Sequence, residues 1–220
     1  RVLFRSHRLI CGDSTLAATY VPLLGGALAD MVFTDPPYGV DYAASIDAKI
    51  DAGITAKRHK PIANDAGSDE DQAAFWLAAF TQLAAAIKPG AAYYVAAPQG
   101  GRMMMMMMQA MTAAGIPQRH EIIWRKNTFV LGRSDYHYQH EPILYGWREG
   151  GAHAFYGGRS QTSVWDFDKP QKADLHPTMK PVELVQKAVW TSEGTLSFSQ
   201  EGADGGRLNT GTDSKLIVVP

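Results

Sequence analysis

The sequence contains little of what several protein classes require. A single cysteine, Cys11, excludes an intramolecular disulfide framework and a cysteine-rich zinc site, and it fits a reducing cytoplasm. The longest apolar stretch, Met103 to Met111, is too short to cross a membrane. Lys and Arg number 21 against 22 Asp and Glu, a net charge of -1, which argues against a histone-like nucleic-acid binder. We therefore expect a soluble, cytoplasmic globular protein without a membrane partner.

The first two thirds of the chain alternate strand and helix patterns. Apolar runs predict strands, and longer segments with capping and stop residues predict helices. Residues 39–67 show no clear period and predict a long loop. Strands separated by helices favour an α/β fold with a mostly parallel sheet covered on both faces. The expected strands are 8–11, 31–33, 92–95, 121–124 and 142–145, and the expected helices are 15–24 with Ser14 as N-cap, 68 to about 88 with Lys88-Pro89-Gly90 as its stop, the methionine-rich stretch, and one starting at Pro181.

The composition divides the chain into four parts. We predict a catalytic α/β region over 7–147 and a small irregular insertion over 148–175. A helix over 176–191 follows. The rest, 192–220, is rich in Gly, Ser and Thr and predicts a flexible, divergent tail, with no strand-like run before Leu216–Val219.

The run of six methionines, Met103–Met108, covers every side of its predicted helix. The favoured interpretation is a buried helix or an irregularity of the sequence. A methionine-rich binding surface is the alternative.

The most informative residues are Thr34-Asp35-Pro36-Pro37-Tyr38, directly after the strand-like run that ends at Phe33. Two prolines remove two backbone donors and stiffen the turn. The turn lies at the carboxyl end of a strand, where open α/β sheets bind ligands. Asp35 and the Pro36 carbonyl offer two acceptors, which suits an –NH₂ group, and the Tyr38 ring suits a planar base. This pattern indicates positioning of an exocyclic amino group for attack on an electrophile.

These residues resemble the signature of the amino-group DNA methyltransferases, which use S-adenosylmethionine. Cys11-Gly12-Asp13-Ser14 is similar to an element that precedes that signature, and Asn64-Asp65 resembles a short element after it. The order, with the signature before the His176–Leu184 segment, resembles the permuted β group. Tyr136–Pro142 also resembles members of that group.

The resemblance implies a class I, Rossmann-like methyltransferase fold that is permuted, with DNA as substrate and S-adenosylmethionine as cofactor. It implies a catalytic corner of Asp35, Pro36, Pro37 and Tyr38. It places Asp13, Thr34, Thr178, Lys180 and Pro181 near the cofactor, with Lys180 suited to the methionine carboxylate. For Asp13 a turn that caps the next helix is an equal alternative, and for Thr178 and Lys180 an N-cap and a solvated lysine are alternatives. The Asp at position 35 favours adenine N6, with cytosine N4 as the alternative.

One departure from the family concerns the cofactor half. The β group continues with a strand, Asp-Pro-Phe and a Gly-x-Gly turn, and residues 192–220 contain neither motif. We interpret this as a truncation or frameshift near residue 191, and the non-Met start at Arg1 as the sign of an internal piece. An inactive DNA-binding remnant is therefore a second hypothesis, and methylation of RNA or of a protein glutamine is a third.

Contacts with DNA are expected from basic residues that lie among aromatic ones, because cations hold phosphates and rings stack on bases. The candidates are Arg125, Lys126, Arg133 and Arg159, with 148–175 as the target-recognition region. A surface set of arginines around an aromatic core is an equal alternative. The resemblance also admits a homodimer and a restriction endonuclease as partners.

Other catalytic patterns are missing from the sequence. His137, His140 and Glu141 lack the His-Glu-x-x-His spacing, so no metal site is expected. No phosphate-binding Gly-x-x-x-x-Gly-Lys-Ser/Thr occurs, and no Ser-His-Asp grouping has local support.

Overall fold

The computed structural model describes residues 2–4, 7–39, 42–51, 67–129, 135–170, 180–193, 197–199, 207–209 and 216–219. Within these ranges no helix is long and apolar enough to span a membrane. The helices are α1 (Ala17–Leu24), α2 (Tyr42–Asp51), α3 (Asp69–Ala86), α4 (Gly101–Ala113) and α5 (Val182–Glu193). The strands are β1 (Val2–Phe4), β2 (His7–Leu9), β3 (Ala29–Thr34), β4 (Ile87–Ala96), β5 (His120–Arg125), β6 (His140–Trp147), β7 (Val164–Asp166), β8 (Ser197–Ser199), β9 (Arg207–Asn209) and β10 (Leu216–Val219).

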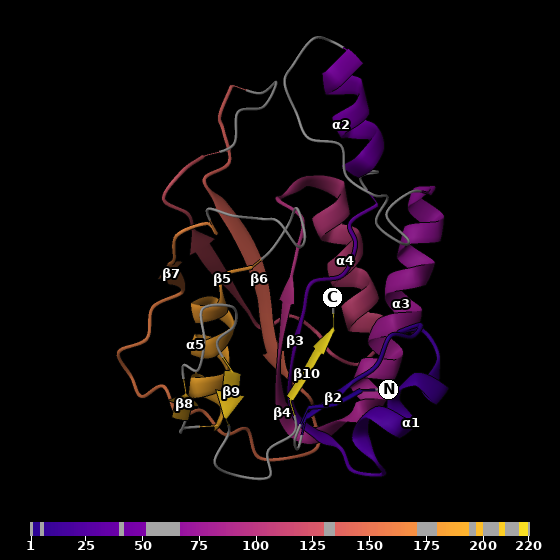
Figure 1. The fold of residues 1–220 in the computed structure, drawn as a ribbon, viewed down its shortest axis with the longest axis vertical. Helices are drawn as coiled ribbons and strands as arrows, with labels where there is room; N and C mark the ends of the chain where they lie inside the picture. The colour runs from indigo at the N-terminus through magenta and orange to yellow at the C-terminus, as the bar shows by residue number, and fades with distance from the viewer. Residues whose placement is uncertain are drawn as a thin grey trace.

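A six-stranded sheet in the order β10-β3-β4-β6-β5-β7 forms the centre of the molecule (Figure 1). The pairs β10-β3, β3-β4 and β5-β7 are parallel, whereas β6 is antiparallel to both of its neighbours. Five of these six strands therefore run in one direction and β6 runs against them. The carboxyl ends of β3, β4 and β5 and the amino end of β6 consequently meet at one edge of the sheet.

Helices cover both faces of this sheet, as the sequence predicts. Alternate residues of each strand point to opposite faces. In β3, Val32 packs with α1, α3 and α4, whereas Met31 and Phe33 pack with α5 and the far strands. Figure 1 shows α5 on one side of the sheet and α3 and α4 on the other. The α/β fold class is confirmed.

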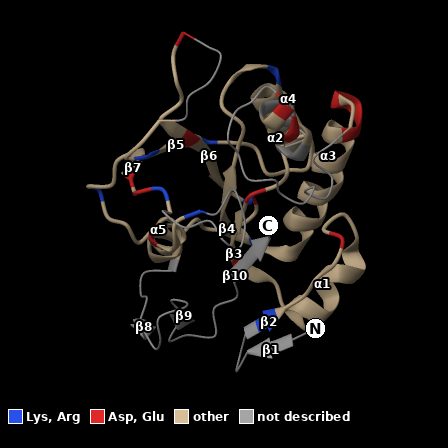
Figure 2. Ribbon diagram, turned by 45° about the horizontal axis from the view of Figure 1, so that its top comes forward, with Lys and Arg blue, Asp and Glu red and all other residues tan. Residues whose placement is uncertain are grey.

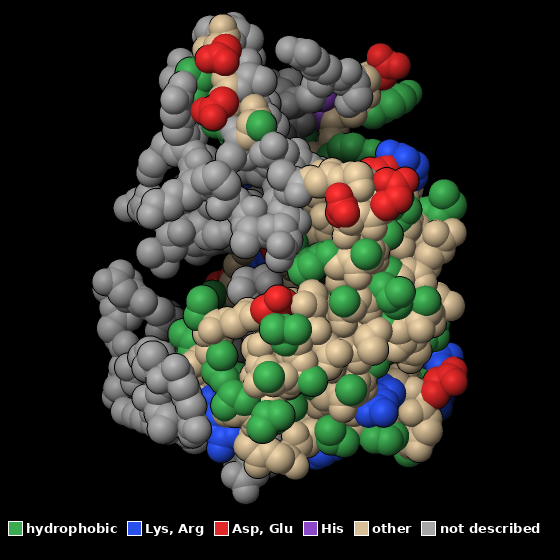
Figure 3. Space-filling view, turned by 90° about the vertical axis from the view of Figure 1, so that its right-hand side faces the viewer, with side chains coloured by type: hydrophobic (Ala, Val, Ile, Leu, Met, Phe, Trp, Pro, Cys, Tyr) green, Lys and Arg blue, Asp and Glu red, His purple; other side chains and the backbone are tan. Residues whose placement is uncertain are grey.

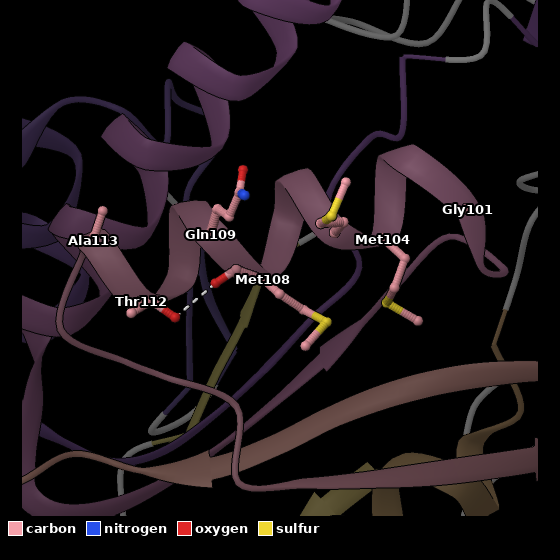
Figure 4. Close-up of a pocket in the computed structure, with 7 residues that line it drawn as sticks. Gly101, Met104, Met108, Gln109, Thr112 and Ala113 are labelled. Atoms are coloured by element: carbon pink, nitrogen blue, oxygen red, sulfur yellow. Dashed lines mark hydrogen bonds between the residues drawn. The ribbon is translucent and has the colours of Figure 1, made fainter.

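The methionine-rich segment forms α4, and its buried face explains most of the run. Met107 and Met111 are fully buried against the sheet, and Met105 is exposed. Figure 4 shows the outer side of this helix, where a shallow hollow is present. Its lining comes from α4 itself, namely Gly101, Met104, Met105, Met108, Gln109, Thr112 and Ala113. The buried-helix interpretation therefore holds for one face of α4.

Several local predictions were wrong. Residues 42–51 form α2 instead of a loop. Helix α1 begins at Ala17 with Leu16 as its N-cap, so Ser14 does not cap it, and Gly25 ends it in the left-handed conformation. Helix α3 ends at Ala86, and Lys88-Pro89-Gly90 belongs to β4. The register of β3 and β4 shifts between Ala29 and Met31, and a bulge of this kind accommodates a proline.

The tail prediction concerns residues that are only partly described. Strands β8 and β9 pair with each other, and β10 lies parallel to β3 at the edge of the main sheet. Leu216–Val219, the strand-like run noted in the sequence, thus extends the sheet beside the strand that carries the Pro-Pro turn. Flexibility of the tail stays a prediction.

Helix α3 begins with a capping box, and this gives a test of the fold. Ser68 Oγ accepts a hydrogen bond from the Asp71 N–H at 3.1 Å, and Asp71 Oδ2 accepts one from the Ser68 N–H at 3.1 Å. Ser68→Ala removes the first of these bonds and should lower the free energy of unfolding by about 1 kcal/mol in urea titrations. Thr81→Ala, in the same helix, is the control. Alanine is the better helix former there, so we expect an unchanged or slightly higher stability. Equal stability of the two variants would contradict the role of the cap.

Candidate active site

The turn after β3, Asp35-Pro36-Pro37-Tyr38, is called the Pro-Pro corner below. Thr34 is the last residue of β3 and is buried between β4 and β10 in the sheet. The chain then turns out of the sheet at Asp35, and Pro36 is buried. Gly39 follows with φ of 70°, a conformation that glycine adopts without strain. The corner therefore projects from the edge where strand ends meet.

Two side chains of α3 fix the corner from one side. Gln72 Nε2 and Trp76 Nε1 each donate a hydrogen bond of 2.9 Å to the Pro37 carbonyl oxygen. They are four residues apart and so lie on one face of the helix. Gln72 is buried and Trp76 is fully buried. A Cβ on Gly39 would come within 2.8 Å of Gln72 Oε1, so this close approach also requires glycine.

The Asp35 carboxylate has a partner on each oxygen. Tyr38 Oη donates to Asp35 Oδ1 at 3.0 Å, and Lys180 Nζ donates to Asp35 Oδ2 at 2.7 Å. Burial, together with the negative charges of Asp35 and Glu141, raises the pKa of Tyr38 well above 10. The phenol therefore stays protonated and keeps donating to Asp35.

Lys180 belongs to a row of four alternating charges, Lys126, Glu141, Lys180 and Asp35, called the ion-pair chain below. Lys180 Nζ lies 3.2 Å from Glu141 Oε2, and Lys126 Nζ lies 2.5 Å from Glu141 Oε1. Only 10% of the Lys180 side chain and 5% of the Lys126 side chain are exposed. Lys126 follows β5, Glu141 is near the start of β6, and Lys180 precedes α5. The ion-pair chain thus connects the ends of four elements.

Within the ion-pair chain, opposite charges compensate for the cost of burial. Burial by itself would raise the pKa of Glu141, but the Lys180 and Lys126 ammonium groups outweigh it and hold that pKa below the ordinary 4.5. Burial would likewise lower the pKa of Lys180, but Asp35 and Glu141 hold it above the ordinary 10.5. Glu141 and Lys180 are therefore both charged at neutral pH.

The other residues expected at the site are placed as follows. Pro181 is buried directly before α5. Asp13 accepts hydrogen bonds from the Thr15 N–H and hydroxyl at 2.8 and 2.7 Å, and these bonds lower its pKa; it makes a local turn but does not cap α1, whose N-cap is Leu16. Thr178 lies outside the described residues, as does the Asn64-Asp65 element.

The four side chains expected to contact DNA lie in different surroundings. Arg125 makes a two-pronged ion pair with Asp166, at 2.6 and 2.8 Å, and Arg159 is exposed. Lys126 is buried, bound to Glu141 and 5.2 Å from the centre of the Trp124 ring. Arg133 lies outside the described residues. Figure 2 shows acidic residues gathered at the start of α3, away from β5 and β7.

Three residues of the site have roles that the sequence did not reveal. The sequence presents Glu141 within the Tyr136–Pro142 resemblance and as a rejected metal ligand, and among the described residues no group of three or more acids, histidines or cysteines could hold a metal. Gln72 and Trp76 looked like ordinary residues of a helix. For Gln72 and Trp76 the available signal was their spacing of four residues. For Glu141 it was a single acid at the start of an apolar strand.

Comparison with known proteins defines the fold class. No protein-family model matches the sequence, and no curated protein matches it. Solved structures that are similar to this chain include two of M1.HpyAVI. M1.HpyAVI in complex with S-adenosylmethionine aligns at 15% identity and a TM-score of 0.51, over 81% of this chain and 72% of that one. A second structure of M1.HpyAVI aligns at 14% identity and 0.50, over 81% and 71%. The chain thus shares a Rossmann-like α/β fold with these two structures.

Glu141 gives this site a defined acid dependence. A carboxylate whose pKa is lower in the folded state contributes stability that is full above about pH 4.5 and is lost as the pH falls through the folded value. Glu141→Gln should lower the free energy of unfolding by about 3 kcal/mol at pH 7, since it leaves two buried ammonium groups undercompensated. The difference from wild type should shrink as the pH falls from about 4.5 toward the folded pKa, because Glu141 takes up a proton first in the unfolded chain and only at the lower value in the folded one.

Glu149→Gln is the matched control for this measurement. Glu149 pairs with Arg119 at 2.9 Å, but 74% of its side chain is exposed. Its loss should therefore change stability by less than about 1 kcal/mol at either pH. Urea titrations from pH 3.5 to 7 make the comparison. A Glu141→Gln deficit that is constant over this range would contradict the charge compensation described for Glu141.

Proposed function

We propose that the chain is an S-adenosylmethionine-dependent DNA methyltransferase that acts on the exocyclic amino group of a base. The observation that carries this proposal is the Asp35 carboxylate, fixed by Tyr38 and Lys180 in a rigid turn at the carboxyl end of β3. The likeness to M1.HpyAVI, whose structure contains S-adenosylmethionine, supports the proposed cofactor. The signature resemblance of the corner supports the proposed substrate.

The corner's chemistry follows from its acceptors. A carboxylate offers about four acceptor positions, and Tyr38 and Lys180 use one on each oxygen of Asp35. The remaining positions and the Pro36 carbonyl would accept both hydrogens of an amino group. This favours pyramidal nitrogen and directs its lone pair away from the acceptors. The Tyr38 ring, held through its hydroxyl, would stack on a base that has been flipped out of the duplex.

The described residues fit the charged end of S-adenosylmethionine. That end carries one ammonium and one carboxylate, and the site offers the acids Asp35 and Glu141 beside the Lys180 ammonium. Glu141 Oε2 is buried and, apart from its ion pair with Lys180, has no hydrogen-bond partner in the described part of the chain. When bound, the cofactor supplies the electrophilic methyl group. We propose that Lys180 holds its carboxylate, with Thr34, Pro181, Thr178 and Asp13 as proposed neighbours.

The finer substrate assignments rest on the sequence. Asp at position 35 favours adenine N6 over cytosine N4. We propose Arg125, Arg133 and Arg159 as phosphate contacts, and 148–175 as the target-recognition region. Arg125 would exchange its Asp166 partner for phosphate. Lys126, whose ammonium is bound to Glu141, fits a role inside the site better than a phosphate contact.

Methyl transfer to oligonucleotides tests this proposal. With labelled S-adenosylmethionine, duplexes whose only amino-bearing target is adenine should be labelled, and cytosine-only duplexes should not. Asp35→Asn should lower the rate by at least about 100-fold, because an amide nitrogen replaces one acceptor by a donor. Asp30→Asn is the matched control, since Asp30 lies near the other end of β3 in an ion pair with Lys88. Label on cytosine alone would assign N4 instead, and no label on either would refute the proposed function.

The second candidate is a DNA-binding remnant without activity. The absence of Asp-Pro-Phe and Gly-x-Gly from 192–220 favours it. Titration calorimetry of the chain with S-adenosylmethionine separates the two candidates. The methyltransferase proposal predicts saturable binding with a micromolar Kd that weakens at least tenfold in Lys180→Met. DNA binding without any S-adenosylmethionine binding would favour the remnant.

A further inference from the structure

The role of Glu141 is the open question at this site, because it touches the reacting corner only through Lys180. Its two oxygens bind two different lysines, Lys180 at 3.2 Å and Lys126 at 2.5 Å. Lys180 in turn binds Asp35 at 2.7 Å. A lysine has a flexible four-carbon stem and a compact charge, so one contact does not define where its ammonium sits. Contacts to two separate carboxylates do define it.

We propose that Glu141 is a positioning residue that holds the Lys180 ammonium against Asp35 Oδ2 and thereby sets the plane of the Asp35 carboxylate. Lys126 anchors Glu141 from the other side. The proposal rests on the methyltransferase function, since it concerns the orientation of the acceptor for the target amino group. It assigns a role to two buried residues that touch neither the base nor the methyl group.

The geometry favours positioning over a purely stabilising role. Replacing a buried ion pair by apolar groups is often neutral or stabilising, so burial of four charges is weak evidence for stability alone. The ion-pair chain joins β5, β6, α5 and the Pro-Pro corner, which come from distant parts of the sequence. An aromatic residue contacts each end of the ion-pair chain. Tyr38 donates a hydrogen bond to Asp35, and the Trp124 ring lies beside the Lys126 ammonium.

Charge balance gives Glu141 a second effect on the reaction. The ion-pair chain contains two acids and two lysines and is neutral as a whole. Without Glu141 it carries one positive charge. In the proposed transfer the target nitrogen would gain positive charge as its bond to the methyl carbon forms and the bond from that carbon to the cofactor sulfur breaks, before the nitrogen gives a proton to solvent. Uncompensated Lys126 and Lys180 would raise the energy of that transition state.

Surface labelling of lysines tests the position of Lys180 without any need for activity. The full chain is treated with acetic anhydride, and mass spectrometry compares acetylation of Lys180 with that of Lys88, whose side chain is 53% exposed. In wild type, Lys180 should react far more slowly than Lys88. In Glu141→Gln it should react roughly tenfold faster than in wild type, because loss of the facing carboxylate lowers the pKa of Lys180 and releases its ammonium group. Glu141→Asp should restore part of the protection, and Glu149→Gln should change nothing.

Kinetics of methyl transfer test the consequence for Asp35. Glu141→Gln should lower kcat by about 10- to 100-fold, with the KM for DNA within about twofold of wild type, because the loss affects the transition state alone. Variants are compared at a temperature where circular dichroism shows each to be folded.

The outcomes separate this inference from the proposed function. Unchanged protection of Lys180 in folded Glu141→Gln would overturn the positioning role, whatever the activity. Faster acetylation with unchanged kcat would overturn the link from Lys180 to Asp35. Absence of methyl transfer in wild type would refute the proposed function, and acetylation would still decide whether Glu141 positions Lys180.

Discussion

Burial of charge at one edge of the sheet is the constraint on which this structure depends. Lys126 and Lys180 are almost fully buried, and a buried ammonium is costly unless a carboxylate faces it. Their partners come from other elements, Glu141 from β6 and Asp35 from the end of β3. The four charges can therefore be paired only when β3, β5, β6 and α5 are all in their native places. The requirement for neutrality couples the assembly of the sheet to the geometry of the site.

The two-sided core supplies the rest of the rigidity. On one face, α3 and α4 pack against alternate strand residues, and on the other face α5 packs against the remaining ones. Figure 3 shows the side of the molecule that carries α3 and α4, where exposed apolar side chains are scattered among polar ones. This side of the molecule therefore provides support for the corner, whereas the chemistry is concentrated at the strand ends. The division agrees with the general placement of ligands in open α/β sheets.

Sequence reasoning reached the parts of this arrangement that depend on neighbouring residues. The apolar runs around Val32 and Tyr93 predicted their strands, and Asp35-Pro36-Pro37-Tyr38 predicted the corner, because local chemistry specifies both. Helix α2 was missed because its residues have weak apolar periodicity. The strand character of Lys88-Pro89-Gly90 was missed because a regular strand disfavours proline and glycine, whereas a β-bulge accommodates them. The link from Glu141 to Lys180 requires knowing that β6 runs against its neighbours, and no local pattern states that.

The two hydrogen bonds to the Pro37 carbonyl have a consequence for how such a site can vary. Gln72 and Trp76 tie the corner directly to α3, across the chain that leads from Gly39 to Gly67. The position of Asp35 is therefore set by β3 behind it and by α3 beside it. The length of the segment between Gly39 and Gly67 does not affect that position. Loop-closure entropy grows slowly with length. Insertions and deletions between Gly39 and Gly67 can accordingly accumulate among related chains while the carboxylate stays in one place.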